Sequence, residues 1–192
     1  PAGEDTIHIC EACCVAINEE IIKEHTECPE CRKNKFTSAK AIEVGNIFKL
    51  KTKFSSAFEC AYKDENGAMR EVIMGCYGIG MNRLMGTIVE VHHDEKGICW
   101  PEAVAPYAVH LLEFDKGKAK GTYDDLQAKG VEVLYDNREK VSPGEKLRDA
   151  DLIGLPWRVI VSKKTEKKME IKKRQEEKSR LVSFKELIKI VQ

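Results

Sequence analysis

The alternation of apolar and polar residues divides the chain into an early and a late part. After residue 106, short apolar runs alternate with amphipathic helical runs. The predicted strands are 108–112, 131–135 and 158–161, and the predicted helices between them are 123–129 and 144–149. Strands that alternate with helices indicate a mostly parallel sheet with right-handed crossovers. This part ends with two further strands and a closing helix, predicted at 169–174, 180–182 and 184–191.

The preceding stretch has the pattern of hairpins and one helix. Strand-like runs at 42–50 and 59–62 precede Asn66-Gly67, a dipeptide that favours the positive φ angles of a tight turn. A strand at 72–76 enters a glycine-rich turn, and 81–91 is a predicted helix with apolar residues at roughly helical spacing. Prolines at both ends of 101–106 resist a helix or a central strand, so a domain boundary is expected there.

Composition adds the broad class of the protein. A chain of 192 residues with 42% hydrophobic content can bury one moderate core or two small ones. It has neither a run of about 18 apolar residues nor a leader-like first segment, so a cytoplasmic protein without a membrane span is expected. The 32 Lys and Arg residues balance 32 Asp and Glu residues, so any contact with nucleic acid depends on a local basic patch.

Five of the eight cysteines are crowded into the first part of the chain. Two C-x-x-C pairs, Cys10 with Cys13 and Cys28 with Cys31, have the spacing of a structural zinc site, and four thiolates suit tetrahedral Zn²⁺. Free or partly buried thiols are the alternative, because the neighbouring Cys14 cannot point at the same ion as Cys13. A short helical run at 18–24 is expected between the pairs.

The segment Gly78–Arg83 joins a predicted strand to a predicted helix. Glycines after a strand let the backbone pass close to a ligand, and the helix N-terminus offers free N–H groups to phosphate. A dinucleotide fingerprint is disfavoured because Arg83 stands where its third glycine belongs. A tight turn that simply needs small residues is the alternative.

Four further segments resemble bacterial-type prolyl-tRNA synthetases, and Gly78–Arg83 resembles motif 3 of the class II aminoacyl-tRNA synthetases to which they belong. The four segments are Ala41–Leu50, Val72–Gly80, His93–Pro101 and Asp149–Pro156. The resemblance implies an α/β chain: the end of a class II antiparallel catalytic sheet with motif 3, then a mixed-sheet anticodon-binding domain. It divides the chain into a cysteine-rich segment at the position of the editing insertion, a C-terminal part of the catalytic domain, and the anticodon-binding domain, at 1–40, 41–102 and 103–192.

The resemblance also implies roles for individual residues. Arg83 is expected to act in catalysis by contacting ATP, for which Gly78 and Gly80 make room. The proline pocket is expected to include Asn46, Cys76 and Gly78, although the family usually has His where this chain has Asn46.

Asp136, Arg138 and Lys146 are the expected anticodon-binding residues. They follow a predicted strand and begin a predicted helix, the edge at which open α/β sheets usually bind ligands. Arg138 and Lys146 are candidates to meet the two guanines of a proline anticodon. Solvated charges are the alternative interpretation of Arg138 and Lys146. The basic positions at 163–168 and 172–174 have two interpretations, contacts to tRNA phosphates and solvated charges.

As a whole, the resemblance implies a proline–tRNA ligase that uses ATP with Mg²⁺, acts on proline and tRNA(Pro), and is a homodimer when intact. Motifs 1 and 2 are not found in this chain, so by itself it is expected to be an inactive monomer. The short 18–27 segment between the cysteine pairs leaves no room for an editing domain. The competing interpretations are a stand-alone tRNA-binding or regulatory paralogue without catalysis, and a general zinc-ribbon nucleic-acid module.

Overall fold

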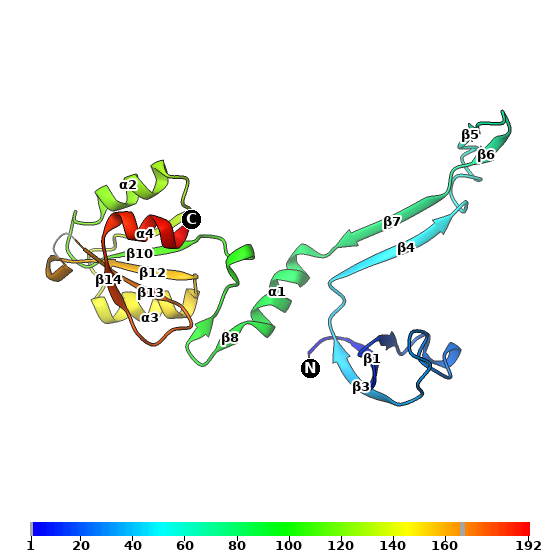
Figure 1. The fold of residues 1–192 in the computed structure, drawn as a ribbon, viewed down its shortest axis with the longest axis horizontal. Coiled ribbons are helices and arrows are strands. Elements are labelled where there is room, and N and C mark those ends of the chain that lie inside the picture. Colours follow the sequence, from blue (N-terminus) through cyan, green and yellow to red (C-terminus); the bar gives the residue numbers. More distant parts are fainter. Residues whose placement is uncertain (1, 166–167) are drawn as a thin grey trace. The chain divides into compact units, whose positions relative to one another are not determined.

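The computed structural model describes residues 2–165 and 168–192. It has two compact units, Pro1–Thr87 and Ile88–Gln192, which are described separately (Figure 1). Two positions of the predicted basic run at 163–168, residues 166 and 167, lie outside the described residues.

The second unit is built on a five-stranded sheet in the order β11-β10-β12-β13-β14. The strands are β10 (Val109–Glu113), β11 (Val133–Asp136), β12 (Trp157–Val161), β13 (Met169–Lys173) and β14 (Arg180–Val182). The first three are parallel, and β13 and β14 run antiparallel to their neighbours. The predicted mixed sheet is therefore confirmed.

Helices cover both faces of this sheet (Figure 1). On one face, α2 (Lys120–Ala128) and α4 (Phe184–Val191) pack on a core that includes Leu111, Val159 and Ile171. On the other face, α3 (Pro143–Ile153) packs on Leu112 and Ile160. Because successive side chains of a strand point to opposite faces, the apolar runs of β10 and β12 supply both cores.

The ends of α3 follow from its sequence. Ser142 Oγ accepts a hydrogen bond from the Glu145 N–H, and Pro143 occupies the first helical turn, where a missing N–H costs nothing. Gly154 ends the helix with a φ of 74°. A Cβ on Gly154 would lie 1.7 Å from the carbonyl oxygen of Ile98, so this close approach also requires glycine. Ile98 belongs to the small hairpin formed by β8 (His93–Asp94) and β9 (Gly97–Ile98).

Among the described residues, single turns of 3₁₀ helix also occur at Ile22–Glu24, Glu102–Val104 and Lys163–Thr165. In the described part of the chain, no helix has the length and apolar character needed to cross a membrane.

The first unit begins with a three-stranded antiparallel sheet in the order β2-β1-β3. Its strands are β1 (Asp5–Cys10), β2 (Ala16–Asn18) and β3 (Phe36–Ala41). The helix predicted at 18–24 is wrong. Ala16–Asn18 pairs with the edge of β1, which buries Ile17, and only the single 3₁₀ turn at Ile22–Glu24 is left.

A two-stranded ribbon and a helix follow. The ribbon consists of β4 (Gly45–Lys51) and β7 (Met74–Ile79), and β5 (Ala61–Lys63) with β6 (Met69–Glu71) forms a hairpin at its end (Figure 1). The predicted turn is confirmed: Gly67 has a φ of 77°, and Asp64 accepts hydrogen bonds from the N–H groups of Asn66 and Ala68. The helix α1 (Met81–Val91) has the predicted bounds.

Large apolar side chains on the ribbon are exposed. Ile47 and Tyr77, which face each other across the two strands, are 80% and 81% exposed. Phe48, Ile79 and Met81 are also exposed. By strand alternation Ile47, Tyr77 and Ile79 share one face of the ribbon, and exposed apolar side chains gathered on one face are typical of a region that another protein segment covers.

Candidate functional sites

The turn between β7 and α1 forms an open hollow of about 590 Å³. Asn46 lies opposite Gly78, and Phe48 lies opposite Cys76, in the antiparallel register of β4 and β7. Residues that are directly opposite share a face, so Asn46, Cys76 and Gly78 lie on one face of the ribbon. A Cβ on Gly45 would lie 3.0 Å from the Gly78 carbonyl oxygen, so the backbones approach closely where the hollow is lined.

Arg83 lies in the first turn of α1 and lines the same hollow. Its Nη1 donates to the carbonyl oxygen of Glu43 at 2.7 Å and lies 3.5 Å from the Glu43 carboxylate. Asn46 Nδ2 donates to the other carboxylate oxygen of Glu43 at 3.2 Å. Glu43 therefore holds Arg83 and Asn46, and the sequence analysis missed it. A half-exposed guanidinium beside a helix N-terminus suits a phosphate or an adenine ring.

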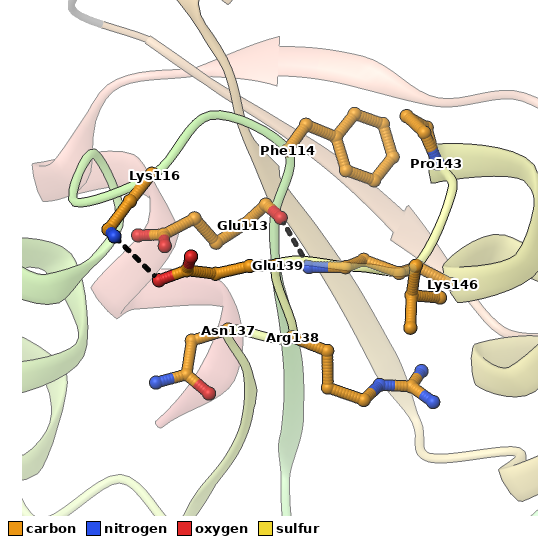
Figure 2. A pocket seen from close by; sticks show the side chains of 9 residues that line it. Glu113, Phe114, Lys116, Asn137, Arg138, Glu139, Pro143 and Lys146 are labelled. Carbon is orange, nitrogen blue, oxygen red and sulfur yellow. Dashed lines mark hydrogen bonds and ion pairs between the residues drawn. The ribbon is translucent and has the colours of Figure 1, made fainter.

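A second cavity, here called the strand-end cavity, lies where β10 and β11 end and α3 begins (Figure 2). Its volume is about 210 Å³. Figure 2 shows Glu113, Phe114 and Lys116 from the end of β10 and the loop after it, with Asn137, Arg138 and Glu139 from the loop after β11. Parallel strands bring their carboxyl ends to one edge, which explains why residues about twenty positions apart meet here.

Lys146 reaches this cavity from α3, but its side chain is buried. Its Nζ donates to the carbonyl oxygen of Glu113 at 2.6 Å (Figure 2). It also donates to the carbonyl oxygen of Asp136 at 3.2 Å and lies 3.6 Å from the Asp136 carboxylate. These contacts join the two strand ends that line the cavity. The direct base contact expected of Lys146 stays a prediction, and the contacts that the structure gives its ammonium group are structural.

Two carboxylates hold the guanidinium group of Arg138 in one orientation. Its Nε and Nη2 donate to the two oxygens of Asp136 at 2.9 and 2.8 Å, and Nη2 also donates to Asp149 at 2.6 Å. Burial raises the pKa of Asp136, but the hydrogen bonds from Arg138 and the charge of Lys146 bring the net pKa below its usual value. The side chain of Arg138 is 47% exposed, so a ligand can reach a guanidinium whose orientation is already fixed. Asp149 was missed in the sequence analysis because its partner is eleven residues away.

Glu113 is a further residue that sequence reasoning missed. Its buried carboxylate accepts the N–H of Ala119 and the hydroxyl of Tyr135 at 2.9 and 2.7 Å. Burial alone raises the pKa of Glu113, but these hydrogen bonds lower it below the usual value. Glu113 thus fixes the loop after β10 at the floor of the strand-end cavity.

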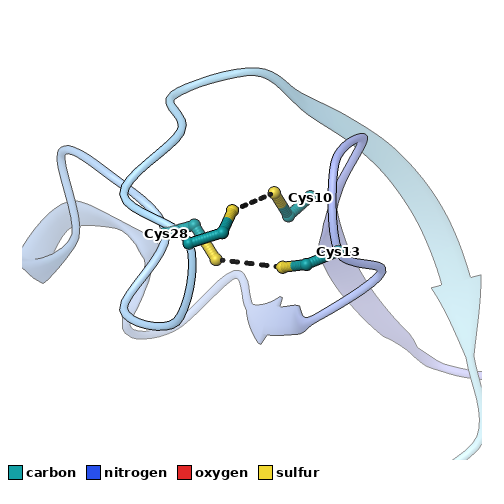
Figure 3. Close-up of side chains that lie close together, drawn as sticks. Cys10, Cys13 and Cys28 are labelled. Carbon is teal, nitrogen blue, oxygen red and sulfur yellow. Dashed lines mark hydrogen bonds between the residues drawn. The ribbon is translucent and has the colours of Figure 1, made fainter.

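The four predicted zinc ligands come together in the first unit (Figure 3). The sulfurs of Cys10, Cys13, Cys28 and Cys31 all lie within 4.8 Å of one another. Two of the distances, Cys10 to Cys31 and Cys13 to Cys28, are 3.5 Å. Tetrahedral Zn–S bonds of about 2.3 Å place sulfurs about 3.8 Å apart, whereas a disulfide requires about 2.05 Å. The spacing therefore fits a metal and not a disulfide.

The two cysteine pairs have the same backbone geometry. The N–H of Cys14 donates to the Cys10 carbonyl, and the N–H of Arg32 donates to the Cys28 carbonyl, both at 2.9 Å. Cys14 and Arg32 have φ values of 61° and 60°. Cys14 is thus a turn residue with an exposed side chain, equivalent to Arg32, and it lies outside the cluster.

Backbone N–H groups of these turns stabilise thiolates, although burial and the neighbouring thiols leave the net pKa values of Cys13 and Cys31 raised. The Ala12 N–H lowers the pKa of Cys10 to about 7 against the effect of burial. The Cys31 N–H likewise lowers the pKa of Cys28. Thiolates are the form that binds metal, so this backbone favours metal binding. The nearby His25 is not among the clustered groups.

Two protein families match separate parts of this chain. The family described as "tRNA synthetase class II core domain (G, H, P, S and T)" matches residues 14–92, and the family described as "Anticodon binding domain" matches residues 103–192. The first match contains the hollow with Arg83, and the second contains the strand-end cavity.

The chain is also similar to named proline–tRNA ligases. It is 48% identical to that of Caldicellulosiruptor bescii over 171 residues, which are 85% of this chain and 30% of the relative. It is 44% identical to that of Bacillus subtilis over 173 residues, which are 86% of this chain and 30% of the relative. The chain thus spans about a third of the length of these relatives.

Among solved structures, the prolyl-tRNA synthetase of Cryptosporidium parvum complexed with L-proline and AMP is similar in fold. The TM-score is 0.64 with 22% sequence identity, over 75% of this chain and 32% of the other.

Proposed function

We propose that this chain belongs to the proline–tRNA ligase family and that, within a longer protein, it serves ATP-dependent charging of tRNA(Pro) with proline, because it combines a class II core segment with an anticodon-binding domain. The observation that carries the proposal is the succession of the two domain types in one chain, at 44–48% identity to bacterial relatives. In this proposal residues 1–40 form the cysteine segment, 41–102 the catalytic part, and 103–192 the tRNA-binding part.

At the catalytic end, Arg83 contacts a phosphate or the adenine of ATP. Gly78 and Gly80 leave room for the nucleotide, and Asn46 and Cys76 border the proline on the same face of the ribbon. Mg²⁺ bound with ATP would supply further positive charge when the nucleotide is present. The reaction depends on positioned charge more than on a covalent enzyme intermediate. Arg83 would therefore stabilise negative charge on the phosphate, and Glu43 would orient the Arg83 side chain.

The exposed apolar side chains of the ribbon support the proposal that other parts of the longer protein pack against this chain. Ile47 and Tyr77 are each at least 80% exposed, on the face of the ribbon opposite to Asn46, Cys76 and Gly78. In the longer protein, further parts of the catalytic domain would pack on this apolar face. The chain alone is therefore expected to give no proline-dependent exchange of pyrophosphate with ATP.

At the other end, the strand-end cavity is proposed to receive a guanine of the anticodon. Arg138 offers hydrogen-bond donors to the base, and Asp136 holds the Arg138 side chain in place. Lys146 contributes positive charge and joins the cavity walls. The cysteine cluster is proposed to hold one structural Zn²⁺ through Cys10, Cys13, Cys28 and Cys31.

The experiment that tests this function measures binding of two RNA hairpins by the 192-residue chain. One carries a proline anticodon, and the other has its two guanines replaced. We expect tighter binding of the first hairpin at moderate salt. Equal binding of both, with the same dependence on salt, would contradict anticodon recognition and leave only contacts to phosphates.

A further inference from the structure

Lysine residues gather in two segments of the second unit, although the chain as a whole is formally neutral. The segment 115–120 leads from β10 into α2, and the segment 162–165 follows β12. Together they contain five lysines and one acidic residue, Asp115. β10 and β12 are parallel neighbours, so both segments lie at the carboxyl edge of the sheet. The name lysine ridge is used here for Lys116, Lys118, Lys163 and Lys164.

Asp115 joins the two segments. One of its carboxylate oxygens accepts the N–H of Lys163 at 2.6 Å, and the other lies 3.7 Å from Lys163 Nζ. The Phe114 N–H also donates to the carbonyl oxygen of Val161 at 3.1 Å. The one acidic residue of these segments therefore holds them side by side, and the lysines of both segments lie next to each other.

The backbone of each segment is fixed by hydrogen bonds within the chain. The buried carboxylate of Glu113 accepts the Ala119 N–H at 2.9 Å, and Gly117 has a φ of 74°, which allows the chain to turn there. In the other segment, Thr165 Oγ1 accepts the Ser162 N–H at 3.2 Å. A binding partner then has to order only the lysine side chains, which lowers the entropic cost of binding.

The side chains of the lysine ridge are exposed to solvent. Those of Lys116 and Lys163 are 78% and 75% exposed. Lys118 has no ion pair within the described part of the chain. Like charges gathered on one surface repel each other, and a partner with several negative charges relieves this repulsion. The ridge therefore suits a chain of phosphates.

The lysine ridge lies beside the strand-end cavity, and Lys116 belongs to both. The sheet order β11-β10-β12 places the end of β10 between Arg138, which follows β11, and Lys163, which follows β12. Neighbouring strands are about 4.8 Å apart, so the ends of β11 and β12 are separated by about 10 Å. The backbone of a nucleotide whose base occupies the cavity is therefore within reach of the ridge.

We propose that the lysine ridge binds successive phosphates of the RNA backbone, on the side of the strand-end cavity away from Arg138. This inference rests on the proposed tRNA-binding function and identifies the surface that supplies much of its affinity. Phosphate contacts carry no sequence information, whereas base contacts do. The ridge therefore sets how tightly the domain binds RNA and how strongly salt weakens binding, and the strand-end cavity sets which base is preferred.

The test uses the 192-residue chain and the two anticodon hairpins, with and without the guanines. Lys118→Ala combined with Lys164→Ala should weaken both hairpins by the same factor, roughly 5- to 50-fold at about 0.1 M salt, and should reduce the salt slope by about 1.5 units. The ratio of the two affinities should not change. Replacement of the same two lysines by Arg should retain the slope of the unaltered chain, because the positive charges are kept.

Lys129→Ala combined with Lys189→Ala is the matched control. Both lysines are exposed, and Lys129 lies at the end of α2 opposite to the ridge. Lys189 lies in the last turn of α4, which is fastened there by a hydrogen bond from Gln192 Nε2 to the Lys129 carbonyl oxygen. The control should bind as the unaltered chain does. An equal loss in both double variants, or an unchanged salt slope in the ridge variant, would overturn the proposal.

Hairpins that carry one neutral methylphosphonate at a time locate the contacts. At two or more successive positions, this change should weaken binding by the unaltered chain and by the control, and have little effect on the ridge variant. The same sensitivity in all three proteins would contradict the ridge. Absence of a guanine preference in the unaltered chain separately identifies failure of the proposed function, because the salt slope does not depend on which base is read.

Discussion

Arg174 and Asp94 form a two-point ion pair, with Nη1 and Nη2 of the arginine 2.8 and 2.7 Å from the two carboxylate oxygens. Arg174 Nε also donates to the carbonyl oxygen of Asp151 at 3.0 Å. The arginine side chain is only 5% exposed. These bonds fasten the β8–β9 hairpin to the end of β13 and to α3. Arg174 belongs to the basic stretch for which the sequence left phosphate contacts open, and its guanidinium is occupied here instead.

We expect Asp94→Asn to lower the unfolding temperature of the second unit, because it leaves a buried guanidinium without its carboxylate. The hydrogen bonds from Arg174 hold the pKa of Asp94 well below its usual range. The stabilisation is therefore complete above the unfolded pKa of about 4 and is lost progressively as the pH falls from there through the much lower folded pKa. Thermal unfolding should show a larger difference between wild type and variant at pH 7 than at pH 3. Asp124→Asn, which removes an exposed pair with Lys120, is the control and should have little effect at either pH.

His110 should make the second unit sensitive to mild acid. Burial lowers the pKa of His110 to about 4, while Asp136 and Asp149 oppose the shift and Arg138 and Arg158 add to it. Because the unfolded chain takes up this proton near pH 6.5 and the folded one near 4, stability is complete above pH 6.5 and falls between these values. The loss is at most about 3 kcal/mol.

His110→Gln should remove most of this dependence between pH 6.5 and 4 in denaturant titrations. His92→Gln, at an exposed position, is the control and should retain it. Identical pH profiles for all three proteins would show that His110 is not protonated in this range.

The cysteine cluster predicts about one zinc ion for each chain. Changing Cys10 or Cys28 to Ser should abolish stoichiometric zinc and unfold the small β2-β1-β3 sheet, because each sulfur is one of only four donors. Cys14→Ser should keep the metal, because that side chain is exposed and outside the cluster. Metal analysis of protein never exposed to a chelator provides the measurement. A zinc content near zero in the wild type would remove the assignment.

Arg138→Ala should weaken RNA binding, whereas Lys146→Ala should lower folding stability. Arg138→Ala should cost about 1–3 kcal/mol in binding a hairpin with the guanines of the proline anticodon, and much less for one without them. Lys146→Ala should lower folding stability on the order of 1–3 kcal/mol, because two buried carbonyl groups lose their donor.

Binding titrations at two salt concentrations distinguish base reading from neutralisation of phosphate. If Arg138 only neutralises a phosphate, all hairpins weaken alike and the salt slope falls by about one unit. Lys116→Ala is a useful comparison, because Lys116 is exposed at the rim of the strand-end cavity and pairs with Glu139.

The local pattern of residues was sufficient for most of the elements. The alternation after residue 106 predicted the mixed sheet, and the helix at 81–91 has its predicted bounds. These features depend on the spacing of apolar side chains within a few residues, which a single sequence displays directly. The helix predicted at 18–24 is wrong: strand pairing of Ala16–Asn18 with the neighbouring β1 includes its first residue, and only a single 3₁₀ turn forms at Ile22–Glu24.

The sequence by itself determined the four-cysteine set, the strand-to-helix turn with Arg83, and the family that these motifs resemble. Only the tertiary structure decided how individual charges are used. Lys146 is buried against carbonyl groups of two strand ends, Arg138 is held by Asp149 on the next helix, and Arg174 pairs with a residue eighty positions away. A charged side chain has the same appearance in a sequence whether it lies in solvent or in a buried ion pair. Its partners are fixed by how the helices and the hairpin pack on the sheet, and that packing depends on contacts far apart in the chain.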